Sequence, residues 1–335
     1  MSSDESIPDP RHQRQPPVIT VWGMPASRIP QPVPRNPRVS VIVGTYNCAA
    51  FLPGLWASLE AQTFRDFEIV VVDDASDDGE TLPALEAMGD RIRLIRRAEN
   101  SGTCELPRYQ GTQAAHAGLC AFLDADDRWD PEFLERCVGY LEEHPEAALV
   151  HTAVRVIDGE DRVLRIRHEG VLETIRDWPR ALLDHCFITI SATVVRRDIW
   201  LAALPESEIR DFGMDQDFFL LIAKKYPLGT LPEVLASYRR SASSVSVKKW
   251  KRAPRNVNTL ERIYRKGLWR GVTSRGEMRR IMTEAYLENA RYWRGQGDPF
   301  RSRWFAVRGL RRNPISLVLW KETAMGFVKI FRSSR

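Results

Sequence analysis

Residues 39–80 read VSVIVGTYNCAAFLPGLWASLEAQTFRDFEIVVVDDASDDGE. Two continuous apolar, β-branched runs, residues 39–44 and 67–72, are typical of strands that are covered on both faces of a sheet. The segment between them, residues 49–63, has apolar side chains at helical spacing and predicts a helix that connects parallel strands. Each run stops at polar side chains, which are Thr45, Tyr46 and Asn47 after the first and Asp73 and Asp74 after the second.

The alternation of strand and helix continues downstream and predicts an α/β fold with a Rossmann-like, mostly parallel central sheet. In such open sheets, ligands bind outside the carboxyl ends of the strands, so polar residues that follow different strands should meet at one rim. The predicted helices span residues 81–89, 106–118, 131–145 and 215–227, and the predicted strands span residues 92–97, 119–127, 147–158 and 187–199.

The net charge of +5 hides a division into an acidic and a basic part. Residues 248–335 hold 23 Lys and Arg but 6 Asp and Glu, whereas residues 1–247 hold 26 and 38. The acidic part suits metal binding, and the basic part, which has a helical pattern, suits an anionic surface such as nucleic acid or membrane headgroups. The segment 314–332 fits either a packing helix with a charged outer face or an interfacial helix on an anionic membrane.

The cysteines and the first residues bear on the compartment. The five cysteines are scattered without zinc-ligand or CxxC spacing, which favours reduced, intracellular thiols. Residues 1–37 are rich in Pro and Gln and predict a disordered arm without the apolar centre of a signal peptide. No uncharged apolar run reaches the roughly 18 residues of a membrane-spanning helix. We therefore expect a cytoplasmic protein, with peripheral association at the inner face of the membrane through residues 250–335.

Three aspartates, Asp124, Asp126 and Asp127, leave the fourth strand of the predicted sheet. Alternate residues leaving a strand point the same way, so Asp124 and Asp126 can share one side. Their hard oxygen ligands suit Mg²⁺ or Mn²⁺, which commonly bridge to substrate phosphates. The alternative is a solvated acidic turn that caps the helix beginning near Pro131.

Five further residues at strand or helix ends allow a functional and a structural interpretation. Asp74 could accept the imide N–H of a uracil or thymine whose face Tyr46 covers, or it could serve in a turn or helix cap beside a packing tyrosine. Arg108 could reach a diphosphate as a planar cation, or it could be a surface arginine. Asp215 and Asp217 open a helix, and one of them could take a proton from a sugar hydroxyl, or one could simply be the N-cap of that helix.

Five segments in this order resemble family 2 glycosyltransferases with the A-type (GT-A) fold: VSVIVGTYN (39–47), FEIVVVDDASDD (67–78), NSGTCELPRYQG (100–111), FLDADDRWDP (122–131) and GMDQDFFLLIAKKYPLGTLPEVLASYRRSASSVS (213–246). The resemblance implies a GT-A domain over residues 38–246, with a nucleotide-binding half at 38–127 and an acceptor half at 128–246. A basic helical extension at 247–335 would follow it.

The resemblance also implies nucleotide-sugar donors, one divalent metal ion and inversion at the anomeric carbon. By position, Asp215 corresponds to the catalytic base, with Asp217 as the alternate. Asp126 corresponds to a ligand of Mn²⁺ or Mg²⁺. The nucleotide-sugar contacts implied in this way are Thr45, Tyr46, Asn47, Asp74, Arg108 and Asp124.

Two positions depart from the family pattern. Met214 stands where members often carry Glu before the base, and Ser241 stands where a His near the metal is common. The QxxRW motif of processive synthases is absent from the sequence, which favours addition of a single sugar. These departures leave open whether the base is Asp215 and whether the loop at 241 takes part in metal binding.

We therefore expect an inverting transferase that moves a sugar from a nucleoside-diphosphate sugar, a UDP-sugar in our hypothesis, to a hydroxyl acceptor in cell-surface polysaccharide or glycolipid synthesis. The acceptor would be a saccharide or a lipid-linked saccharide. The alternatives are a sugar-nucleotide nucleotidyltransferase and a non-catalytic scaffold that binds nucleotide sugars. A nucleic-acid partner is not expected, because the tryptophans of the basic part have helical spacing and no RRM or OB pattern accompanies them.

Overall fold

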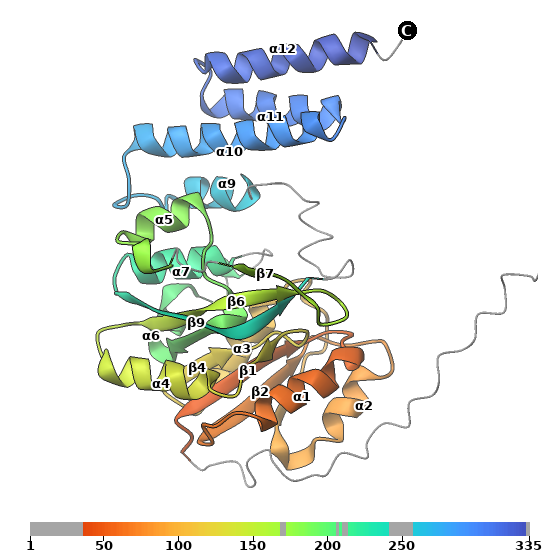
Figure 1. The fold of residues 1–335 in the computed structure, drawn as a ribbon, viewed down its shortest axis with the longest axis vertical. Helices are drawn as coiled ribbons and strands as arrows, with labels where there is room; N and C mark the ends of the chain where they lie inside the picture. The colour runs from red at the N-terminus through yellow and green to blue at the C-terminus, as the bar shows by residue number, and fades with distance from the viewer. Residues whose placement is uncertain (1–35, 168–171, 206–207, 210–213, 241–256, 333–335) are drawn as a thin grey trace, which may run out of the picture.

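The protein is described by a computed structural model that covers residues 36–167, 172–205, 208–209, 214–240 and 257–332. The expected arm at residues 1–37 lies almost wholly outside these described residues, and so does Ser241. Figure 1 shows a twisted sheet with helices packed on it and a stack of helices, α9 to α12, at the end of the molecule where the chain terminates.

One sheet forms the centre of the molecule. Among the described residues it has nine strands in the order β3-β2-β1-β4-β8-β6-β9-β5, with β7 paired to β6. The strands are β1 (Val39–Thr45), β2 (Phe67–Asp73), β3 (Arg93–Arg96), β4 (Leu119–Phe122), β5 (Arg128–Trp129), β6 (Leu149–Ile157), β7 (Val163–Arg167), β8 (Thr193–Arg196) and β9 (Leu228–Arg239).

The pairing directions confirm the expected α/β fold with a mostly parallel sheet. Strands β3, β2, β1 and β4 are parallel neighbours, and so are β6 and β9, which form the longest ladder. The pairs β4–β8, β8–β6, β6–β7 and β9–β5 are antiparallel. The chain leaves β1 for β2 on one side and returns to β4 on the other, so the carboxyl ends of these strands form the crevice in which open α/β sheets bind ligands.

Helices cover both faces of the sheet and enclose two hydrophobic clusters. The first lies between the sheet and the helices α1 and α4, and the second between the sheet and α3, α5, α6, α7, α9 and α10. The helices are α1 (Leu52–Glu60), α2 (Thr81–Glu86), α3 (Glu105–Ala114), α4 (Phe133–Glu143), α5 (Trp178–Asp184), α6 (Arg197–Ala203), α7 (Asp215–Ala223), α9 (Val257–Lys266), α10 (Arg275–Gly295), α11 (Pro299–Arg312) and α12 (Leu317–Arg332). Short 3₁₀ turns are η1 (Ala49–Phe51), η2 (Gly89–Arg91), η3 (Leu172–Thr174) and η4 (Ile190–Ala192).

The single strand predicted at residues 187–199 is wrong in extent. A 3₁₀ turn occupies residues 190–192, β8 occupies residues 193–196, and α6 begins at Arg197. Residues 187–199 mix apolar residues with Thr, Ser, Arg and Asp, and this pattern does not mark where a strand ends and a helix begins. The boundary follows instead from tertiary pairing, because β8 pairs with β4 and β6 over only these few residues.

The C-terminal helices share a core with the sheet. Phe218 and Phe219 of α7 belong to the same buried cluster as Leu260 of α9 and Met278 and Tyr286 of α10. This continuity means that the helices after residue 257 stabilise α7, the helix that begins at Asp215. Within the described residues, no helix combines the length and apolarity that crossing a bilayer requires.

Candidate functional site

The ends of β1 and β2 lie side by side at the rim. Thr45 is opposite Asp73 in the parallel register, and its hydroxyl donates to an Asp73 carboxylate oxygen at 3.2 Å. The backbone N–H and the hydroxyl of Ser76 also donate to that carboxylate. The side chain of Thr45 is only 2% exposed. Thr45 therefore supports the rim from inside the sheet, and its contact with a nucleotide-sugar donor stays a prediction.

Tyr46 and Asn47 follow β1 and differ in their surroundings. Asn47 adopts a left-handed backbone conformation, with φ 48°, and its amide oxygen accepts from the N–H groups of Asp77 and Asp78. Its amide nitrogen donates to the Asp77 carboxylate at 2.7 Å. Asn47 therefore fixes the loop that follows β2. The Tyr46 ring remains 46% exposed above that loop, where it is available to a flat ligand.

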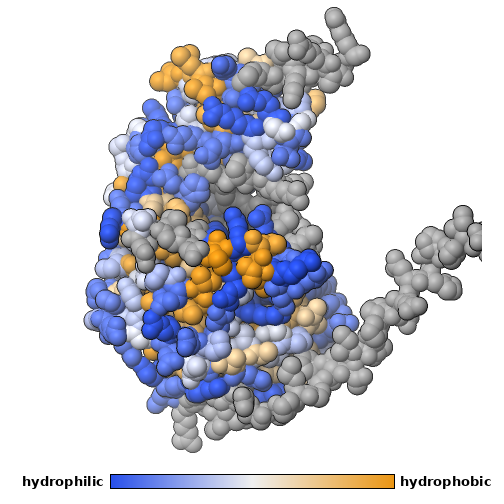
Figure 2. Space-filling model, viewed as in Figure 1, coloured by the Kyte–Doolittle hydropathy of each residue, from blue (hydrophilic) through white to orange (hydrophobic). Residues whose placement is uncertain are grey.

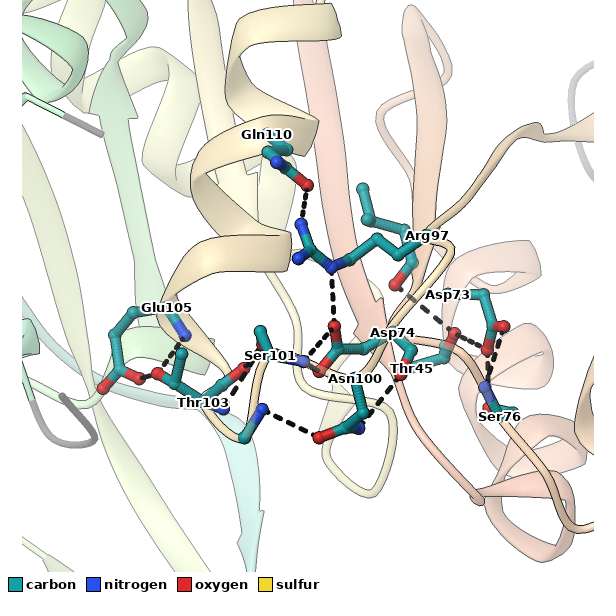
Figure 3. A network of polar contacts seen from close by, with 12 residues as sticks. Thr45, Asp73, Asp74, Ser76, Arg97, Asn100, Ser101, Thr103, Glu105 and Gln110 are labelled. Atoms are coloured by element: carbon teal, nitrogen blue, oxygen red, sulfur yellow. Dashed lines mark hydrogen bonds and ion pairs between the residues drawn. The ribbon is translucent and has the colours of Figure 1, made fainter. Parts of the chain in front are cut away.

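Asp74 is held in a polar network that Figure 3 shows from close by. Its carboxylate pairs with Arg97 at 2.7 Å and accepts from the N–H and the hydroxyl of Ser101 at 3.0 and 2.8 Å. Asn100 donates to the Asp74 carbonyl at 3.0 Å. Asp74 is 4% exposed. A carboxylate has about four acceptor positions, so these donors leave room for one more hydrogen bond. The contact of Asp74 with a uracil N–H stays a prediction.

Arg108 joins two of the predicted site residues. One terminal nitrogen of its guanidinium donates to Asp124 and the other donates to Asp215, each at 2.8 Å. The Arg108 side chain is 4% exposed, whereas the Asp124 and Asp215 side chains are 33% and 26% exposed. A buried cation thus holds two carboxylates that face the solvent in part. The structural alternative, a surface arginine, is wrong for Arg108.

Asp215 opens α7 and has the electrostatics of a proton acceptor. Burial raises the pKa of Asp215 to about 7, and the negative charges of Glu105 and Asp124 act in the same direction. The positive charges of Arg108 and Arg262 oppose this shift of the pKa. A carboxylate with a pKa near neutrality exchanges a proton readily at physiological pH.

Glu105 is a site residue that the sequence analysis missed. It begins α3, is 3% exposed, and accepts a hydrogen bond from the backbone N–H of Met214 at 3.0 Å. Thr103 donates its hydroxyl to the same carboxylate, so Glu105 continues the network that starts at Asp74 (Figure 3). Although position 214 is Met, a carboxylate from another element therefore lies beside Asp215. Glu105 precedes Arg108 by three residues on one helix, and residues at this spacing share a helix face. This spacing could have indicated Glu105 from the sequence.

Asp217 is buried away from the rim. Its side chain is 0% exposed and accepts from Nε and Nη2 of Arg262 at 2.8 and 3.0 Å. Arg262 belongs to α9 and is itself 5% exposed. An enclosed carboxylate in a bidentate ion pair cannot reach a substrate hydroxyl, so the geometry favours Asp215 over Asp217 as the base.

The aspartates after β4 fit a divalent cation. Burial raises the pKa of Asp126 to about 6 and the charge of Asp124 raises it further, while the charge of Arg239 opposes the shift. A bound divalent cation would favour the charged form of Asp126. One oxygen of Asp127 is buried without a hydrogen-bond partner in the described residues, while the other accepts from the N–H of Arg239 at 2.7 Å. Nowhere in the described ranges do three or more His, Cys, Asp or Glu form a metal cage. Such a cage is not required for Mg²⁺ or Mn²⁺ sites in which one or two carboxylates and the substrate's phosphates bind the ion.

Comparison with known sequences gives a family and two long matches. Residues 40–200 match the profile described as glycosyl transferase family 2. TuaG of Bacillus subtilis (strain 168), a glycosyltransferase provisionally assigned to teichuronic acid biosynthesis, is 27% identical over 70% of this chain and 93% of its own length. An uncharacterised glycosyltransferase, alr2836 of Nostoc sp. (strain PCC 7120), is 30% identical over 60% of this chain, and the match spans 64% of that protein.

Solved structures show the same fold. TarS residues 1–349 of S. aureus in complex with UDP-GlcNAc superimposes with a TM-score of 0.56 at 18% identity, covering 86% of this chain and 79% of that one. The mannosyltransferase PcManGT from Pyrobaculum calidifontis, in complex with GDP-Man and Mn²⁺, gives a TM-score of 0.52 at 19% identity and covers 92% and 89%. Both likenesses concern the arrangement of strands and helices.

Proposed function

Since the chain belongs to glycosyltransferase family 2 and has the GT-A fold, we propose that it moves one sugar from a UDP-sugar to a hydroxyl acceptor with inversion. The acceptor in this proposal is a saccharide, free or lipid-linked, of a cell-surface polysaccharide or glycolipid. Support comes from TuaG, with its provisional place in teichuronic acid biosynthesis, and from TarS, a poly(ribitol-phosphate) β-N-acetylglucosaminyltransferase whose structure holds UDP-GlcNAc.

The observation that carries the proposal is the contact of Arg108 with both Asp124 and Asp215. These three residues come from α3, the end of β4 and the start of α7, and they lie up to 107 positions apart. An arginine, a carboxylate beside the proposed metal ligand and a carboxylate with a pKa near 7 thus occupy one rim. A transferase that breaks a sugar–phosphate bond needs groups that stabilise the leaving diphosphate and a group that accepts the acceptor's proton.

In the proposed reaction, the acceptor oxygen attacks the anomeric carbon while the bond from that carbon to the diphosphate oxygen breaks. Asp215 accepts the acceptor's proton as the new carbon–oxygen bond forms, and the nucleoside diphosphate leaves with the electron pair of the broken bond. In this proposal, the Arg108 guanidinium offsets negative charge on the departing diphosphate. Attack opposite the leaving group accounts for inversion.

The Asp126 carboxylate, with Asp124 beside it, would hold Mn²⁺ or Mg²⁺, because these ions prefer oxygen donors and a cation would offset the charge that Asp124 adds near Asp126. When bound, the ion supplies Lewis-acid neutralisation of the leaving diphosphate. Ser191 helps to fix this segment, because its hydroxyl accepts from the Asp124 N–H at 3.2 Å. In the nucleotide pocket, the exposed ring of Tyr46 would cover the uracil while Asp74 accepts its imide N–H.

The proposal is tested by incubating the full chain with a panel of nucleoside-diphosphate sugars and Mn²⁺ or Mg²⁺, with nucleoside diphosphate release as the readout. Release from a UDP-sugar, stimulated by an acceptor, is the expected result. Donor binding without release would identify a scaffold. Consumption of a nucleoside triphosphate and a sugar phosphate, with release of pyrophosphate, would identify a nucleotidyltransferase.

The metal assignment has a separate test in Asp126→Ala. Removing this carboxylate should weaken Mn²⁺-dependent donor binding by at least tenfold, as measured by calorimetry with and without the ion. Asp90→Ala, an exposed aspartate of η2, serves as the matched control and should leave binding unchanged. Unaltered metal dependence in Asp126→Ala would remove Asp126 as a ligand.

A further inference from the structure

The outer surface of the last helices carries exposed apolar side chains. Among the described residues, eleven large hydrophobic side chains are exposed, and six of these lie between positions 300 and 320. They are Phe300, Trp304, Ile315, Leu317, Val318 and Trp320, and their exposed fractions range from 45% to 86%. Figure 2 shows apolar side chains gathered at the end of the molecule that α11 and α12 form, bordered by hydrophilic ones. We call these six residues and the cations around them the α11–α12 face.

Positive charge outnumbers negative charge around these side chains, although Arg301 pairs with Asp298 and Arg312 pairs with Glu261. From residue 299 to residue 324 the sequence has six basic residues and one acidic residue, Glu322. Glu322 is 3% exposed and pairs with Arg291 and Arg294 of α10, so it does not contribute to the outer surface. Arg303, Arg308 and Arg311 line a shallow groove on α11 together with Phe300, Trp304 and Val307.

The exposed apolar residues are not needed for the packing of these helices. Ala306 and Leu319 are fully buried, and a side-chain carbon added at Gly309 would approach both Leu319 and Tyr286 at 2.9 Å. The inward faces of α11 and α12 are therefore tightly packed on α10. The described part of α12 is thus a packing helix, as one of the two expectations had it, but its outer face carries the exposed apolar side chains of Leu317 and Trp320 as well as charge.

We propose that the α11–α12 face binds the surface of an anionic lipid bilayer and inserts its aliphatic and aromatic side chains among the headgroups. Apolar side chains among arginines and lysines are the pattern of interfacial helices, and tryptophan favours the headgroup region. Each basic residue near an anionic membrane adds electrostatic attraction. The proposal rests on the proposed function only for its purpose, which is to bring the rim to a lipid-linked acceptor.

Two other partners fit these residues less well. A second copy of the chain would place the same surface, on which cations outnumber carboxylates, against itself in a symmetric contact. A nucleic acid would use the arginines and tryptophans, but bases do not stack on Ile315, Leu317 or Val318. The aliphatic side chains therefore favour the bilayer.

The test is co-sedimentation of the full chain with phosphatidylcholine vesicles, with and without 30% phosphatidylglycerol. We expect at least tenfold stronger partitioning to the anionic vesicles. The double variant Ile315→Ser/Leu317→Ser should lose at least tenfold of it, and Arg308→Ala/Arg311→Ala should lose a similar amount. The matched control Val163→Ser/Leu164→Ser changes two side chains of β7 that are each 57% exposed, and it should stay within twofold of the wild type.

Several results would overturn the proposal. Equal partitioning to both vesicle types would do so, and so would an equal loss of binding in the β7 control. A dimer in sedimentation velocity that becomes monomeric in the Ile315/Leu317 variant would assign the surface to a second copy. RNA that displaces the vesicles would assign it to nucleic acid. Nucleoside diphosphate release from UDP-sugars is measured on the same proteins. If the variants lose vesicle binding but release nucleoside diphosphate at the wild-type rate, the transferase proposal is unaffected. If the wild type binds vesicles but releases no nucleoside diphosphate, the membrane proposal holds and the transferase proposal fails.

Discussion

The buried pair of Asp217 and Arg262 connects the sheet domain to the C-terminal helices, and removing one partner should destabilise the whole chain. Arg262→Met leaves the Asp217 carboxylate at 0% exposure without its bidentate cation. A charge left unpaired in the interior costs about 3–5 kcal/mol, because neither water nor a counter-ion replaces the lost partner. The same substitution should also weaken α7, the helix that presents Asp215.

The magnitude translates into a measurable denaturation shift. With an m-value of about 3 kcal/mol per M in urea, a loss of about 4 kcal/mol lowers the urea midpoint by about 1.3 M. The double variant Asp217→Leu/Arg262→Met removes both charges and fills the space with apolar atoms, so it should recover most of the loss. The matched control is Arg280→Met, since Arg280 pairs with Glu277 and Glu284 at the surface and is 57% exposed. Exposed pairs contribute about 0–1 kcal/mol, so the control should shift the midpoint by less than about 0.3 M.

The outcome of the urea series decides whether charge compensation is the role of this pair. A midpoint for Arg262→Met that equals that of Arg280→Met would refute the reasoning. So would a double variant that is as unstable as the single one, because the loss would then come from packing and not from the unpaired carboxylate.

Two further predictions concern pH. Burial lowers the pKa of His151 to about 4, and the unfolded chain takes up this proton near pH 6.5, so stability should fall by about 2 kcal/mol from pH 7 to pH 5. In His151→Leu, the free energy of urea unfolding should no longer fall in this way between pH 7 and pH 5. A pH profile equal to that of the wild type would contradict the role of His151. Glu105→Gln removes a negative charge that raises the pKa of Asp215, so the acidic limb of kcat/KM should move to lower pH. Glu99→Gln, an exposed control, should leave that limb in place, and a fixed limb in both would reject Glu105 as a positioning residue.

The sequence predicted the fold and placed the candidate residues at the ends of its strands. Continuous apolar runs that end at Asp74 and Asp124 indicated parallel strands, and the crevice rule then indicated that these residues would approach each other. The structure confirms the fold and brings Arg108 into contact with Asp124 and Asp215. The chemical roles of these residues stay predictions.

The contacts that depend on tertiary packing could not be predicted. Nothing in the local pattern indicated that Arg262 would reach Asp217 across 45 positions, or that Glu105 would accept from the Met214 N–H across 109. The outward direction of Leu317 was equally open, because an amphipathic helix has the same periodicity whether its apolar face meets a core or a membrane. These features depend on which elements are neighbours in space.

The most direct test of the central claim is the turnover of Asp215→Asn. Asparagine keeps an oxygen that can accept from Arg108, so the fold and the donor site should persist while the proton acceptor is lost. We predict a fall in kcat of about 10²–10⁴-fold with a donor Kd that stays within threefold of the wild type. An Asp215→Asn enzyme that releases nucleoside diphosphate at the wild-type rate would contradict the assignment of the base.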